Sequence, residues 1–177
     1  MNETTAKSIA FIDTEVDPAT GRIFDFGGLY ASGPSFHSAS RDDFLRFLTA
    51  AEFVCGHNIL DHDLKYIRKS LASGEAFNYA PIDTLYLSPL LFPRKPYHAL
   101  LKDDKLLTES FNNPLNDSMK AKDLFFDEWN AFKKLDEAMK AIFYLLLQDR
   151  MEFRGFFQFI DYQHHDGSVE SMIRCFC

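Results

Sequence analysis

The sequence is short of cysteine, of basic charge and of long apolar runs, and each shortage excludes a class of protein. Three cysteines in 177 residues are an odd and sparse set, so no disulfide framework is expected. Acidic residues outnumber basic ones by 26 to 19, for a net charge of −7. Bulk charge therefore does not favour a polyanion, and any nucleic-acid contact must be local or bridged by cations.

The longest strictly apolar run covers residues 141–147, which is far too short to cross a bilayer. The first residues lack the basic and apolar regions of a signal peptide. We therefore expect no membrane association and a cytoplasmic, reducing setting.

The chain has instead a large apolar content, 46% hydrophobic with 19 Phe, which is typical of a tightly packed globular core. It contains no repeats, no low-complexity tracts and no linker that would divide it. We expect a single domain over residues 1–160. Residues 161–177 are either a tail or the start of a linker to a following domain.

The order of the predicted elements indicates the fold class. Apolar runs and turn residues predict strands at 8–12, 22–31, 35–38 and 53–55, with the first three in an antiparallel meander. Ser40 begins a capping box for a helix. A second helix is expected from about Asp61 to Gly74, and a third at 84–91 behind the N-cap Asp83. From Pro114 to about Ile160 the chain is predicted helical, with a break near Asp127. The whole reads as α/β, a mixed five-stranded sheet flanked by helices with a helical C-terminal part.

Four carboxylates occupy positions where a charge is costly. Asp13 and Glu15 lie at the end of the first strand, two residues apart, so the strand period points both to the same side. Asp63 and Asp117 each fall on the apolar stripe of a helix, and neither has an obvious inward Lys or Arg partner in sequence. Oxygen-rich clusters of this kind favour Mg²⁺ or Mn²⁺. The alternative for the Asp13 and Glu15 pair is an ordinary solvated strand end.

Three segments carry a family resemblance. They are Phe11-Ile12-Asp13-Thr14-Glu15, then Gly56-His57-Asn58 with Asp63 five residues beyond the Asn, then the stretch from Asp117 to Phe125. In order and spacing they resemble the three motifs of the DEDD (DnaQ-like) superfamily of 3′–5′ exonucleases, which have an RNase H-like fold. The more specific resemblance is to the exonuclease-like N-terminal domain of bacterial RecQ-type DNA helicases.

The resemblance implies a metal-dependent exonuclease that removes nucleotides from the 3′ end of single-stranded DNA or of 3′ overhangs. Asp13, Glu15, Asp63 and Asp117 would hold two Mg²⁺ or Mn²⁺ ions in a two-metal mechanism. A covalently fused helicase domain is an implied partner, and RNA is an alternative substrate.

The third motif departs from the family pattern. The catalytic histidine of the histidine branch would stand at Asn112, and the tyrosine of the tyrosine branch at Asn113. Neither amide is a useful base, so the enzyme is expected to be slow or silent. A catalytically degenerate domain that binds or docks nucleic acid is therefore the alternative function. His98 and Asp103 repeat the family's His-to-Asp spacing and form a weaker candidate for the motif, and His98 is also a candidate substitute base.

Four further residues are candidates for substrate contact. Thr14 and Val16 stand beside the acids and, by the resemblance, would pack on the terminal base. His57 and Asn58 are expected first to fix the loop before Asp63 by hydrogen bonds, and also to contact substrate.

Overall fold

A five-stranded mixed sheet forms the centre of the computed structural model, which describes residues 7–100 and 113–164. The strand order is β3-β2-β1-β4-β5. β1 pairs antiparallel with β2 and parallel with β4, β2 pairs antiparallel with β3, and β4 pairs parallel with β5. The strands are β1 (Ile9–Val16), β2 (Ile23–Tyr30), β3 (Ser35–Ser38), β4 (Phe53–Gly56) and β5 (Ala80–Asp83). This is the α/β, RNase H-like arrangement that the sequence predicts.

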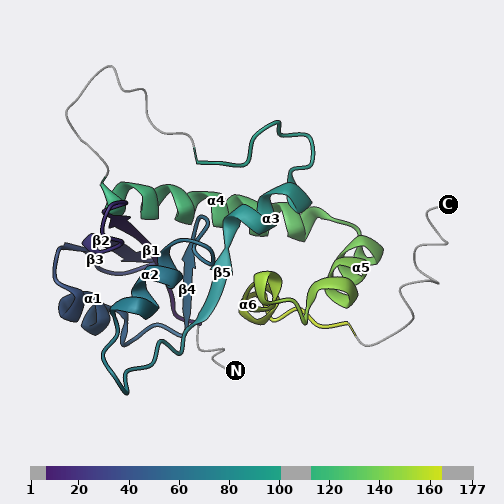
Figure 1. The fold of residues 1–177 in the computed structure, drawn as a ribbon. Helices are drawn as coiled ribbons and strands as arrows, with labels where there is room; N and C mark the ends of the chain where they lie inside the picture. Colours follow the sequence, from purple (N-terminus) through teal and green to yellow (C-terminus); the bar gives the residue numbers. More distant parts are fainter. Residues whose placement is uncertain (1–6, 101–112, 165–177) are drawn as a thin grey trace.

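Helices cover both faces of this sheet (Figure 1). Their bounds are α1 (Arg41–Leu48), α2 (Asp63–Ser70), α3 (Thr84–Leu91), α4 (Pro114–Lys134), α5 (Glu137–Leu147) and α6 (Met151–Ile160). Ser40 caps α1 by accepting a hydrogen bond from Asp43 N, and Asp83 caps α3 by accepting one from Leu85 N. Both caps were predicted from the sequence.

Two apolar cores lie on opposite sides of the sheet because alternate residues of β1 point in opposite directions. Phe11 faces α4 and packs against Phe125, with ring centroids 5.6 Å apart. Ile12 faces the other way, into the core that includes Phe44 of α1 and Ile67 of α2. The same alternation continues along β1 and determines the side of the sheet on which Asp13 and Glu15 lie.

Three boundaries differ from the sequence prediction. β1 continues to Val16, so Asp13 and Glu15 lie within the strand and not beyond it. α2 ends at Ser70, because the backbone is already extended at Leu71. α4 runs without a break through Asp127, because buried Phe125, Glu128 and Phe132 continue one inward stripe. None of the described helices is long and apolar enough to span a membrane.

Candidate metal centre

Asp13 and Glu15 present their carboxylates on the α4 side of the sheet. Both are an even number of residues from Phe11, which packs against α4, so the strand period places them on that side. Both side chains are half-buried. The same strand therefore supplies two acids to one partly enclosed position.

Asp117 reaches this position from the first turn of α4. Asn113 is the N-cap and accepts a hydrogen bond from Leu115 N at 3.0 Å, and Pro114 begins the helix. Gly27 of β2, which pairs with Asp13, makes the approach possible. A Cβ atom at Gly27 would lie only 2.2 Å from the backbone of Pro114 and Leu115. The helix start thus rests directly on the strand next to Asp13.

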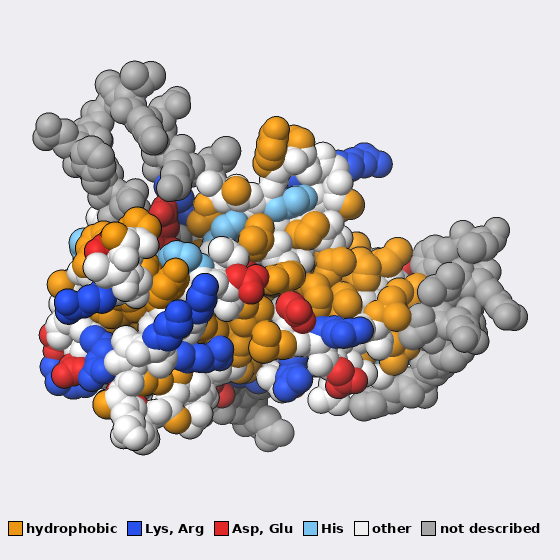
Figure 2. Space-filling model, viewed as in Figure 1, with side chains coloured by type: hydrophobic (Ala, Val, Ile, Leu, Met, Phe, Trp, Pro, Cys, Tyr) orange, Lys and Arg blue, Asp and Glu red, His pale blue; other side chains and the backbone are white. Residues whose placement is uncertain are grey.

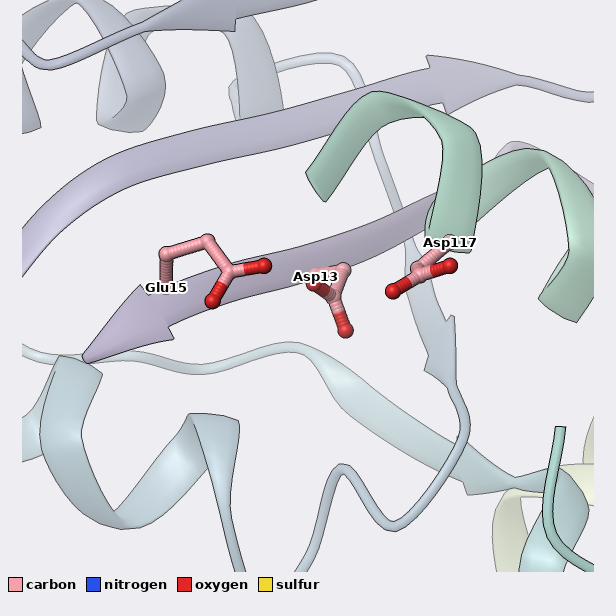
Figure 3. A group of neighbouring side chains, drawn as sticks. All are labelled: Asp13, Glu15 and Asp117. Carbon is pink, nitrogen blue, oxygen red and sulfur yellow. The ribbon is translucent and has the colours of Figure 1, made fainter. Parts of the chain in front are cut away.

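One carboxylate oxygen from each of Asp13, Glu15 and Asp117 lies within 4.8 Å of the other two. Figure 3 shows Asp13 and Glu15 on β1, with the side chain of Asp117 directed toward Asp13 from α4. We call these three residues the acidic cluster. Lys120, one turn further along α4, pairs with Asp117 at 3.3 Å. From the sequence, no Lys or Arg was an obvious inward partner of Asp117, so this pairing was missed.

The acidic cluster fits a divalent metal by its chemistry. Its donors are carboxylate oxygens, which Mg²⁺ and Mn²⁺ prefer. Its three carboxylates repel one another at this separation, and a bound cation would relieve the repulsion. Lys120 supplies one positive charge beside three acids, and a divalent ion would supply more.

Asp63 lies on the other side of β1 from the acidic cluster. It is 1% exposed, and its Oδ1 accepts hydrogen bonds from Thr14 N at 2.8 Å and Thr14 Oγ1 at 2.7 Å. Since Thr14 stands between Asp13 and Glu15, these bonds fix Asp63 to the segment that carries both acids. Asp63 is not one of the three clustered residues, and its role as a metal ligand stays a prediction.

Thr14, 3% exposed, holds Asp63 in this structure. Val16 is half-buried at the end of β1, where the pairing with β2 shifts register. Their contacts with substrate stay predictions. Asn112 and Asp103 lie outside the described residues.

A buried carboxylate organises the loop before Asp63. Asp83 is fully buried and accepts hydrogen bonds from Asn58 N at 2.9 Å, Leu60 N at 3.0 Å and Leu85 N at 2.9 Å. Burial raises the pKa of Asp83 although the three backbone N–H groups oppose the shift. Asn58 has φ 62, a left-handed conformation that Asn tolerates better than most residues. The sequence identified Asp83 as a helix cap but missed its hold on this loop.

His57 begins the same loop with one ring nitrogen engaged. Its Nδ1 lies 2.8 Å from Thr84 Oγ1, and that hydroxyl donates its single hydrogen to Gly56 O at 3.3 Å. In this arrangement Thr84 accepts from Nδ1–H and the lone pair of the ring is on Nε2; in the other tautomer the hydroxyl donates to Nδ1. The predicted loop-fixing role of His57 therefore has a specific partner, Thr84.

The position of His57 relative to the acidic cluster follows from the strand register. Phe11 pairs with Cys55 across β1 and β4, and Asp13 and His57 each stand two residues further on. Burial lowers the pKa of His57, the charge of Asp117 opposes this shift, and His98 adds to it. His57 is therefore a neutral imidazole at neutral pH, within electrostatic range of Asp117.

His98 lies in the segment that follows α3 and contacts that helix. Its Nδ1 lies 2.9 Å from Ser88 Oγ.

Comparison of the chain with family models, with curated proteins and with solved structures finds no match.

Proposed function

We propose that this protein is a metal-dependent 3′–5′ exonuclease that hydrolyses the terminal phosphodiester bond of single-stranded DNA. The observation that carries the proposal is the acidic cluster: three carboxylates from β1 and α4 within 4.8 Å, at one end of the central strand of a five-stranded mixed sheet. The order and spacing of the three sequence motifs support it.

The residues of the chain divide the work as follows. Asp13, Glu15 and Asp117 would hold the metal, and Asp63 is the fourth ligand that the sequence motifs imply. Two divalent ions, when bound, would stabilise charge on the attacking and leaving oxygens of an in-line displacement. Thr14 keeps Asp63 in place through its backbone N–H and its hydroxyl.

Proton transfer requires a base, because the motif position holds Asn112. His57 offers a neutral ring, and its lone pair is on Nε2 in the tautomer in which Thr84 accepts from Nδ1–H. We assign it the proton of the attacking water. The phosphorus gains the water oxygen as the bond to the 3′ oxygen breaks, and that oxygen takes a proton from solvent.

The test is a time course on 5′-labelled single-stranded DNA with Mg²⁺ and with Mn²⁺, beside RNA of the same sequence. A ladder of products shortened from the 3′ end, lost in Asp13→Ala, is the expected result. Glu137→Gln is the matched control, because it removes an exposed carboxylate from α5 and should leave the ladder intact. Silence with both metals on both nucleic acids would overturn the proposal.

One observation favours the alternative of a degenerate domain that binds or docks nucleic acid. Lys120 forms an ion pair with Asp117. In a site that has lost its metal, such a lysine would take the place of the cation. That function predicts nucleic-acid binding without hydrolysis, which the same substrates distinguish. Fusion to a RecQ-type helicase and a cytoplasmic location remain predictions from the sequence.

A further inference from the structure

A groove of about 360 Å³ opens between the start of β2 and α2. We call it the α2 groove. Six of the residues that line it carry the argument: Gly21, Arg22, Phe26, Arg41, Tyr66 and Lys69. It lies on the opposite face of the sheet from α4, so it is separate from the acidic cluster.

The α2 groove is positively charged in a protein that is acidic overall. α2 contains Lys65, Arg68 and Lys69, all exposed, and its one acid is the buried Asp63. Figure 2 shows Lys and Arg side chains gathered at the lower left of the view, over α1 and α2. This local excess of cations contrasts with the net charge of −7 of the whole chain.

The cations of the groove differ in their partners. Arg41 pairs with Asp42 and Glu75, so its charge is already compensated. Within residues 7–100 and 113–164, Arg22 and Lys69 form no ion pair. These two exposed cations are therefore the ones that can meet an anionic ligand.

An aromatic ring lies between the cations. Tyr66 is half-buried in the groove wall, with the Nζ atoms of Lys65 and Lys69 at 5.4 and 5.5 Å from its centroid. His62 meets it edge-on, with centroids 5.3 Å apart. A tyrosine flanked by cations is the combination that single-stranded nucleic acids use, because bases stack on the ring while phosphates meet the cations.

The groove lies close to the end of β1. Val16 pairs with Ile23, and Arg22 immediately precedes that pair. On the helix side, Tyr66 stands one turn after Asp63, whose carboxylate is hydrogen-bonded to Thr14. The groove therefore lies near the end of β1, on the face of the sheet opposite Glu15, and follows α2.

We propose that the α2 groove binds the backbone of single-stranded nucleic acid, with Arg22 and Lys69 on phosphates and Tyr66 stacked on a base. The strand leaves the acidic cluster past the end of β1 and follows α2. The binding itself needs no catalysis, whereas placing the 3′ end at the acidic cluster rests on the proposed function. This local contact explains how an acidic protein holds a polyanion.

The test measures binding of a 5′-fluorescein-labelled single-stranded DNA by anisotropy in EDTA, over a series of salt concentrations. Replacing both Arg22 and Lys69 by Gln should weaken binding. The plot of log K against log salt should become less steep by about 1.4, since each lost phosphate contact changes the slope by roughly 0.7. Tyr66→Leu should weaken binding roughly tenfold and leave the slope unchanged, because it removes stacking and no charge.

The matched control removes two exposed cations elsewhere. Lys133→Gln with Lys134→Gln, at the end of α4, has the same change of net charge and should leave the slope unchanged. An equal loss in this control, or unchanged binding by Tyr66→Leu, overturns the α2 groove as the site. Tighter binding of duplex DNA or of an acidic peptide than of the single strand also overturns it.

The two proposals fail separately. Asp13→Ala should keep the wild-type affinity in EDTA, because the α2 groove does not use the acidic cluster. Binding that depends on the groove, with no product ladder in any metal, would overturn the exonuclease and retain the groove. If wild type gives a product ladder and the groove variants have unchanged KM and kcat, the groove is overturned and the exonuclease is retained.

Discussion

Glu128 occupies a position on α4 where the helical pattern calls for an apolar side chain. It is fully buried, and neither carboxyl oxygen has a hydrogen-bond partner among the described residues. Burial, with a smaller contribution from Asp83, raises its pKa from 4.5 to about 9. Glu128 is therefore protonated at neutral pH, and the core accommodates it as a neutral group.

This residue makes stability depend on pH. The pKa of Glu128 is higher in the folded state than in the unfolded state. Its contribution to the free energy of unfolding is therefore full below about pH 4.5 and is lost as the pH rises toward about 9. The loss is about 1.4 kcal/mol per pH unit in that window. Glu128→Leu removes it, so the variant should gain about 3 kcal/mol relative to wild type between pH 5.5 and pH 8.

Urea unfolding of both proteins at the two pH values measures this difference. Glu137→Gln, at an exposed carboxylate, serves as the control and should follow the wild type. Parallel pH dependence of wild type and Glu128→Leu would contradict a buried protonated carboxyl.

His57 carries the second prediction at this scale. Asn at position 57 retains an N–H near the place of Nδ1, and so the hydrogen bond to Thr84, but it has no lone pair at the place of Nε2. His57→Asn should lower kcat by about 10²- to 10⁴-fold, the usual contribution of a general base, with little change in KM. The ¹⁵N spectrum of the wild-type imidazole should show the proton on Nδ1.

Two results would contradict this role. One is a wild-type rate in His57→Asn, and the other is a proton on Nε2 in the spectrum. Loss of rate in His98→Asn alone would assign the proton to His98, which is held by Ser88.

At the scale of elements, the sequence was informative wherever one residue decides a local structure. The caps Ser40 and Asp83, the strand alternation that pairs Asp13 with Glu15, and the inward position of Asp117 on its helix were all readable, because each depends on near neighbours in the chain. The break expected near Asp127 was wrong because a buried Glu128 looks like the end of an apolar stripe.

Contacts between elements that are distant in the chain could not be predicted from the sequence. Gly27 reads as an ordinary residue of a strand, and only the structure shows that α4 rests on it. In the same way Asp83 reads as a cap, and its bonds to Asn58 and Leu60 join segments about 25 residues apart. Such roles depend on tertiary packing, which no local pattern encodes.

Gly27 gives the prediction at this scale. A methyl group there would meet the backbone of Pro114 and Leu115, which cannot move aside as a flexible side chain could. Gly27→Ala should therefore shift the start of α4 and carry Asp117 away from Asp13. We expect loss of metal-dependent stabilisation and of turnover, although no acid is altered.

Gly155→Ala is the matched control. A Cβ at Gly155 would lie 2.0 Å from Pro81 O, so this variant strains α6 against β5, away from the acidic cluster. Both variants should lower the melting temperature, and both are compared at a temperature where circular dichroism shows them folded. A metal response equal in the two would show that the contact at Gly27 does not position Asp117.

At the scale of the whole molecule, a divalent ion bound by the acidic cluster would stabilise the folded state. Bound metal stabilises the folded state by about 2.7 kcal/mol at a hundred times its dissociation constant, and each kcal/mol moves the melting temperature of a chain of this size by roughly 2 to 4 °C. Millimolar Mg²⁺ or Mn²⁺ should therefore raise the wild-type melting temperature by several degrees. Asp13→Ala should not respond to metal, and in EDTA it should melt at or above the wild-type temperature, because it removes one of three adjacent carboxylates. Differential scanning fluorimetry of both proteins in EDTA and in each metal measures this. A wild type that does not respond to either metal would mean that Lys120 already satisfies the cluster and that the site is an ion pair.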